Sequence, residues 1–105
     1  MANGISISSY QEWTRTMWQP SEDKVHDTNH ALLGLVTEVG EIIDPFKKEW
    51  YTPNRGVEID VKHVEEEIGD LLFYATVLAD QFNLKMEDVI ATNITKLENR
   101  YGNGT

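Results

Sequence analysis

The sequence predicts an all-α domain, and three observations lead to this prediction. Apolar residues recur every three or four positions through most of the chain, which is the period of an α-helix. No strand prediction survives a pass along the whole chain. Two acidic pairs lie within the two most apolar stretches. A chain of 105 residues is long enough for one core, so we expect a single domain over residues 1–105.

The first predicted helix begins at Ser8 or Ser9, because a serine side chain is a favoured N-cap, and it runs to about Met17. Gln11 and Arg15 lie one turn apart on this helix, where they face either solvent or a ligand. Pro20 follows the helix and separates it from the next one.

The second predicted helix covers residues 24–43, with its apolar stripe at Leu32, Leu35, Val39 and Ile42. Gly34 lies on the acid-bearing face, where the missing side chain permits close packing. We expect Asp44 and Pro45 to break or kink the helix, because proline suits a first helical position and not an interior one. A loop is predicted over residues 52–60.

Two further helices are predicted, over residues 61–82 and 86–101. The third helix has a principal apolar stripe at Val64, Ile68, Leu71, Ala75, Leu78 and Phe82. Phe73 and Val77 add a second apolar face, which is typical of a helix buried between subunits. The fourth helix carries Asn93, Lys96 and Arg100 on one face. The predicted architecture is a four-helix bundle completed by oligomerisation.

The two acidic pairs are Glu38 with Glu41 and Glu67 with Asp70, each three residues apart. This spacing puts both carboxylates of a pair on one face of a helix, beside its apolar stripe. When the stripes pack together, the four carboxylates converge, and their repulsion and desolvation favour a bound cation. A solvated helix edge is the ordinary explanation for one such pair. Two pairs, each with a glycine before its second acid, favour a metal site.

Composition excludes several classes of function. The net charge of −9 argues against binding a nucleic-acid polymer through a basic surface. The absence of cysteine excludes disulfides, thiolate zinc sites and thiol nucleophiles. No run reaches the roughly 18 apolar residues of a membrane span, and the N-terminus lacks a signal sequence. We therefore expect a cytoplasmic protein without a membrane partner.

The paired acidic motifs resemble the signature of the all-α nucleoside triphosphate pyrophosphohydrolases. That superfamily includes MazG, the dimeric dUTPases and phosphoribosyl-ATP pyrophosphohydrolase. The resemblance extends to residues 10–16, 30–35 and 93–101, and it is strongest to the small single-domain MazG-like proteins of bacteria and phages. One departure is Thr37, since many members carry a glutamate at this position.

The resemblance implies hydrolysis of a nucleoside triphosphate, or its deoxy form, to the monophosphate and pyrophosphate, as nucleotide-pool housecleaning. It implies Mg²⁺ as the cofactor, with Mn²⁺ able to substitute, held by the catalytic acids Glu38, Glu41, Glu67 and Asp70. Because position 37 is threonine, the general base is expected to be one of the four acids, with Glu41 as the first candidate. The expected substrate-binding residues are Lys48, Asn93, Lys96 and Arg100, together with Gln11 and Arg15. The expected assembly is a homodimer or homotetramer.

Two alternatives remain open at this point. The first is an enzyme similar to phosphoribosyl-ATP pyrophosphohydrolase, which uses related motifs. The second is a non-catalytic helical interaction module whose acids bind a structural cation. Magnesium-dependent release of pyrophosphate from a panel of nucleotides separates these alternatives from the first interpretation.

Overall fold

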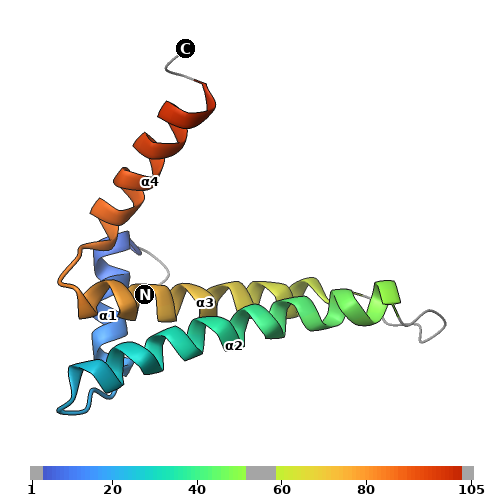
Figure 1. Cartoon of the computed structure of the whole chain (residues 1–105), viewed down its shortest axis with the longest axis horizontal. Coiled ribbons are helices and arrows are strands. Elements are labelled where there is room, and N and C mark those ends of the chain that lie inside the picture. The colour runs from blue at the N-terminus through green and yellow to red at the C-terminus, as the bar shows by residue number, and fades with distance from the viewer. Residues whose placement is uncertain (1–3, 52–58, 103–105) are drawn as a thin grey trace. The chain divides into compact units, whose positions relative to one another are not determined.

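The computed structural model describes residues 4–51 and 59–102, in which the chain forms four helices (Figure 1). These are α1 (Ile7–Met17), α2 (Lys24–Tyr51), α3 (Val61–Gln81) and α4 (Met86–Tyr101). The all-α prediction is confirmed, and the predicted bounds of the third and fourth helices agree with α3 and α4 to within one residue. Most of the predicted loop, residues 52–58, lies outside the described part. Among the described helices, none combines the length and the apolar character that a membrane span requires.

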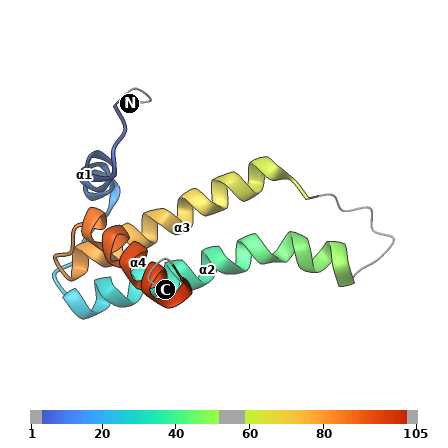
Figure 2. The ribbon, with the colours of Figure 1, turned by 90° about the horizontal axis from the view of Figure 1, so that it is seen from above.

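The chain divides into two compact units. The first unit comprises the chain up to Pro20 and from Thr76 onward, and it contains α1, the end of α3 and α4. The second unit, Ser21–Ala75, contains α2 and the larger part of α3. In this second unit α2 and α3 run in opposite directions as a hairpin, and they diverge towards the end of α2 and the start of α3 (Figure 2).

The N-terminus of α1 begins at a serine other than those predicted. Ser6 is the N-cap, and its hydroxyl accepts a hydrogen bond from the backbone N–H of Ser9 at 3.0 Å. The hydroxyl of Ser9 accepts one in return from the backbone N–H of Ser6 at 2.8 Å. The prediction of Ser8 or Ser9 as the cap was wrong, because Ser6 and Ser9 complete a reciprocal capping box that starts the helix at Ile7.

Pro45 does not break the second helix, and the predicted end of that helix near Ile43 was wrong. Helix α2 continues to Tyr51 with Pro45 inside it. Proline has no N–H, so the carbonyl of Glu41 receives no helical hydrogen bond from position 45. Contacts across the proline favour continuation: Lys48 Nζ lies 2.8 Å from Asp44 Oδ2, and the next turn pairs the rings of Phe46 and Trp50 at 5.6 Å.

Two small residues of α2 are buried. Ala31 is fully buried, and Gly34 is buried against the ring of Tyr74, which a β-carbon at position 34 would overlap. The predicted close packing at Gly34 is therefore confirmed. The predicted apolar stripes are only partly buried, since Leu32, Val39 and Ile68 are exposed. Two helices bury only the strip along which they touch, so a full core at these positions requires further protein surface.

Replacing Gly34 by alanine is expected to destabilise the hairpin by about 1–3 kcal/mol, because the ring of Tyr74 must move to admit the new methyl group. Gly40→Ala is the matched control on the same helix. Nothing lies within 4 Å of a β-carbon at Gly40, so this substitution is expected to raise stability by up to about 1 kcal/mol through helix propensity. Urea denaturation followed by circular dichroism measures both changes. Equal stability of the two variants would contradict the packing described for Gly34.

Candidate functional site

The four acids of the paired motifs lie on the two helices of the second unit. Glu38 and Glu41 come from α2, and Glu67 and Asp70 come from α3. Carboxylate oxygens of Glu38, Glu67 and Asp70 all lie within 4.8 Å of one another. A second group, formed by Glu41, His63 and Glu67, meets the same limit. Glu67 belongs to both groups, so the two helices bring all four acids to one place through this residue.

The first group has an unusual charge balance. The pKa of Glu38 is raised from 4.5 to about 7, first by hydrogen bonding with Glu67, then by burial, then by the charges of Glu67, Asp70 and Glu41. The Glu38 carboxyl therefore holds its proton at pH values where an isolated glutamate has released it. The carboxylates repel one another strongly enough to retain a proton that an isolated glutamate would release.

One carboxylate oxygen of Glu67 is buried without a hydrogen-bond partner among the described residues. The side chain is 13% exposed, and this oxygen is Oε2. A buried carboxylate oxygen without a partner is costly, and protein structures usually satisfy such an atom with a donor, a water or a cation. Oxygen atoms bind Mg²⁺ at about 2.0–2.1 Å, so two ligands on opposite sides of one ion are roughly 4 Å apart. The spacing and chemistry of this cluster fit an oxygen-preferring divalent cation.

His63 is the residue of the cluster that the sequence interpretation missed. It lies one helical turn before Glu67 on α3, and its Nδ1 atom is 3.9 Å from Glu67 Oε1. The signal in the sequence is a histidine four positions before a motif acid, a spacing that puts both side chains on one helical face. His63 belongs to neither acidic pair, so the acidic pairs alone do not predict its place in the cluster.

Lys48, a predicted substrate-binding residue, also belongs to the second unit. Its ammonium group forms the ion pair with Asp44, four residues earlier, and both side chains are more than half exposed. The charge of Lys48 lowers the pKa of Asp44, chiefly through their hydrogen bond. An exposed pair of this kind contributes little to stability, so Lys48 can exchange Asp44 for another anion at small cost.

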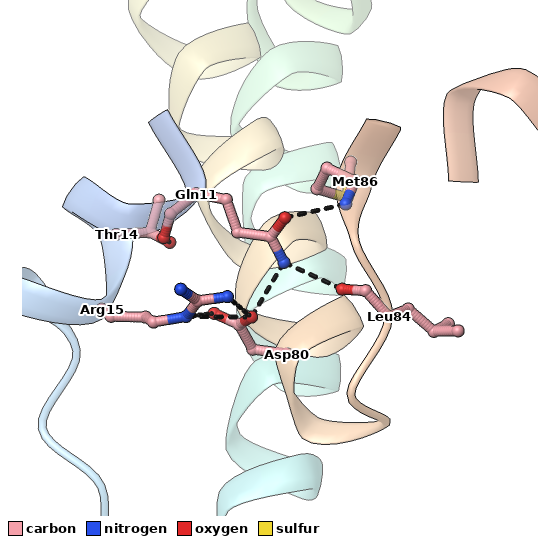
Figure 3. A network of polar contacts seen from close by, with 6 residues as sticks. All are labelled: Gln11, Thr14, Arg15, Asp80, Leu84 and Met86. Atoms are coloured by element: carbon pink, nitrogen blue, oxygen red, sulfur yellow. Dashed lines mark hydrogen bonds and ion pairs between the residues drawn. The ribbon is translucent and has the colours of Figure 1, made fainter. Parts of the chain in front are cut away.

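Gln11 and Arg15 form a network within the first unit (Figure 3). The side-chain amide of Gln11 donates to Asp80 Oδ1 at 2.8 Å and to the carbonyl of Leu84 at 2.9 Å. Its Oε1 atom accepts a hydrogen bond from the backbone N–H of Met86 at 2.8 Å. Arg15 Nη2 lies 3.0 Å from Asp80 Oδ1. Gln11 is 4% exposed. Through its three hydrogen bonds, its amide joins α1 to the end of α3 and the start of α4.

The three predicted substrate-binding residues of α4, also in the first unit, are all exposed: Asn93, Lys96 and Arg100. The guanidinium of Arg100 lies 5.8 Å from the centre of the Tyr101 ring, a distance at which a cation and an aromatic face attract each other. No acidic partner of Lys96 or Arg100 occurs among the ion pairs of the described residues. Both cations are therefore accessible to an anionic ligand.

Comparison with known proteins identifies the family of the chain. The model of the MazG nucleotide pyrophosphohydrolase domain matches residues 26–105, which include both acidic pairs and α4 but not α1. The chain is also similar to the "Gene 37 protein" of Mycobacterium phage L5, at 28% identity over 83 residues, which cover 78% of this chain and 73% of that protein. No solved structure matches. Because the family model covers most of the chain, this protein belongs to the MazG nucleotide pyrophosphohydrolase domain family.

Proposed function

We propose that this protein hydrolyses a nucleoside triphosphate or deoxynucleoside triphosphate to the monophosphate and pyrophosphate, with Mg²⁺ as the cofactor and Mn²⁺ as a substitute. The family supports pyrophosphohydrolase chemistry in general. The observation that carries the proposal is the charge imbalance around Glu67. Its buried Oε2 atom has no hydrogen-bond partner among the described residues, and the neighbouring acids raise the pKa of Glu38. A reaction on a polyanionic substrate requires cations at such a place.

In this proposal Glu38, Glu41, Glu67 and Asp70 hold the metal. When bound, a divalent cation neutralises charge on the phosphates and lowers the pKa of a water molecule. Glu41 is the candidate base, because it is exposed and position 37 carries a threonine, whose hydroxyl donates to the carbonyl of Leu33 at 2.9 Å. A carboxylate on the exposed side of the cluster can take a proton from water and release it to solvent.

Contacts with the phosphates are assigned to Lys48 on α2 and to Asn93, Lys96 and Arg100 on α4. All four side chains are exposed and carry hydrogen-bond donors. Gln11 and Arg15 were also predicted to bind substrate. Their side chains are engaged with Asp80, so in this proposal they support the fold on which α4 rests.

Release of pyrophosphate from a panel of ribo- and deoxyribonucleoside triphosphates, with and without Mg²⁺, tests the proposed function. We expect Mg²⁺-dependent release from at least one triphosphate and none in excess EDTA. A panel that includes phosphoribosyl-ATP separates the related enzyme, because that enzyme would prefer phosphoribosyl-ATP to every simple triphosphate. An absence of turnover on all substrates, with metal bound, would identify a non-catalytic module instead.

The raised pKa of Glu38 predicts how the stability of the metal-free protein depends on pH. Between about pH 4.5 and 7 the folded chain retains a proton on Glu38 that the unfolded chain has released. The contribution of Glu38 is therefore fully present below pH 4.5, and it is lost as the pH rises through about 7. We expect the melting temperature of the wild type, relative to Glu38→Gln, to fall across this range. Mg²⁺ at pH 8 should raise the melting temperature of the wild type more than that of Glu38→Gln. Parallel pH profiles of the two proteins would contradict this account.

We also propose that the protein assembles as a homodimer or homotetramer through the hairpin of the second unit. The large apolar side chains exposed on this hairpin include Leu32, Leu33, Val36, Val39, Ile43, Ile68 and Leu72. An apolar surface of this kind is typical of a protein interface. Of the second apolar face predicted on the third helix, Val77 is already buried within the chain, so the proposed interface uses α2 more than that face.

Val36→Glu is expected to shift the assembly towards the monomer by at least tenfold in dissociation constant, since burying an unpaired charge at an interface costs roughly 2 kcal/mol or more. Val89→Glu is the control, because it makes the same change at an exposed position of α4, outside this hairpin. Sedimentation equilibrium measures the association of both variants. A wild-type protein that remains monomeric at high concentration would refute the assembly itself.

A further inference from the structure

We propose that His63 is a nitrogen ligand of a divalent transition-metal ion held between Glu41 and Glu67. The inference rests on the metal site of the proposed function, but it does not depend on which nucleotide is hydrolysed. It adds to the four acids a residue outside both acidic motifs. It also predicts a chemical preference that four carboxylates alone would not produce.

The geometry of three side chains supports this assignment. One donor atom each of Glu41, His63 and Glu67 lies within 4.8 Å of the other two. Nitrogen and oxygen ligands bind such ions at about 2.0–2.2 Å, so any two donors of one ion are at most roughly 4.4 Å apart. The 3.9 Å between His63 Nδ1 and Glu67 Oε1 is within this limit.

The helix holds His63 in place independently of the metal. Asp60 precedes α3, and its Oδ1 atom accepts hydrogen bonds from the backbone N–H groups of Lys62 at 3.0 Å and His63 at 3.4 Å. This cap fixes the first turn of α3, and the spacing of four residues then directs His63 and Glu67 to one face. Two ligands one turn apart on a helix are a recurrent way to hold a transition metal.

The unpartnered oxygen of Glu67 is a second observation that points to an ion. Within residues 4–51 and 59–102, Oε2 of Glu67 is buried without a hydrogen-bond partner, while Oε1 lies 3.9 Å from His63 Nδ1. A neutral imidazole offers one lone pair to a metal ion and adds no negative charge. It therefore completes a ligand set without increasing the repulsion among the acids. His63 supplies the one nitrogen donor in these two groups of described residues, whose other members are carboxylates.

A nitrogen ligand changes which ion is favoured. Carboxylates suit Mg²⁺ and Mn²⁺ alike, whereas imidazole favours the transition metals over Mg²⁺. We therefore expect Mn²⁺ to bind more tightly than Mg²⁺, and we expect His63 to account for much of the difference.

Electron paramagnetic resonance with Mn²⁺ alone tests the inference without any nucleotide. Spin-echo modulation detects the nitrogen of a directly bound imidazole. The chain has three histidines, so His26→Gln/His30→Gln leaves His63 as its only one. We expect nitrogen modulation in the wild type and in this double variant, and none in His63→Gln. Titration should show Mn²⁺ affinity reduced about tenfold or more in His63→Gln, with a change of less than about threefold for Mg²⁺ measured by competition.

The possible results separate this inference from the proposed function. Tight Mn²⁺ binding without nitrogen modulation in the double variant would overturn the role of His63 and leave the carboxylate site intact. Equal loss of Mn²⁺ and Mg²⁺ affinity in His63→Gln would show that His63 only supports the fold of the site. Failure of the wild type to bind Mn²⁺ would overturn the inference together with the metal site. Pyrophosphate release, measured separately, decides the reaction.

Discussion

Replacing Glu67 by glutamine is expected to reduce kcat/KM for the best triphosphate by at least about a thousandfold. Glu67 is the residue shared by both groups of potential ligands, so its loss affects every ion that the cluster holds. A metal contributes several kcal/mol to stabilising charge in the transition state, and about 4 kcal/mol corresponds to a thousandfold in rate. Pyrophosphate release in saturating Mg²⁺ measures the effect.

The same variant is expected to fold at least as well as the wild type when no metal is present. Glutamine keeps the shape of the side chain and removes a charge that raises the pKa of Glu38. The increase in melting temperature that Mg²⁺ produces in the wild type should disappear. This combination of a stable fold, lost metal response and lost activity distinguishes a ligand from a residue needed only for folding.

Glu65→Gln is the matched control for Glu67→Gln. It makes the same chemical change two residues earlier on α3, where Glu65 is exposed and pairs with Lys62 at 2.9 Å. Such a surface pair contributes at most about 1 kcal/mol to stability. Activity and metal response should therefore remain close to those of the wild type. If Glu67→Gln retained full turnover, the acidic cluster would not be the catalytic centre.

The helices and the acidic cluster were predictable because both follow from local spacing. Apolar residues at helical intervals give α3 and α4 nearly to the residue, and acids three apart share a face on any helix. The convergence of Glu38 with Glu67 required only that the apolar stripes of two helices meet. The periodicity of a single helix was sufficient to predict its bounds and the residues that share one of its faces.

Other features depend on contacts between residues that local rules treat separately. Pro45 usually ends a helix, but α2 continues through it, with an ion pair between residues on either side. The amide of Gln11 is committed to residues near position 80, which no pattern in the first helix reveals. The buried positions of the hairpin include Ala31 and Gly34, because closely approaching helices exclude large side chains at their contact. Propensity and periodicity do not contain this information.

Arg100→Lys is expected to lower kcat/KM for a triphosphate about tenfold, and Arg100→Ala about 10- to 100-fold, if α4 contacts the phosphates as proposed. A hydrogen bond to a charged group is worth roughly 1.5–3 kcal/mol, and lysine cannot reproduce the bidentate contact of a guanidinium. Arg100 is exposed, so both variants should change stability by less than about 0.5 kcal/mol.

Lys24→Ala controls for the loss of a positive charge in Arg100→Ala, because Lys24 is exposed at the start of α2, fourteen residues before Glu38. A general electrostatic effect on a polyanionic substrate would lower kcat/KM of both variants alike. This loss would become smaller as salt is added. A direct contact instead lowers kcat/KM much more in Arg100→Ala than in Lys24→Ala. It also leaves a difference in kcat/KM between Arg100→Lys and the wild type in high salt, since the lysine carries the same charge. Steady-state assays at two ionic strengths measure both differences. Wild-type kinetics in Arg100→Ala would place Arg100 on the surface, outside the substrate site, while leaving the metal cluster unaffected.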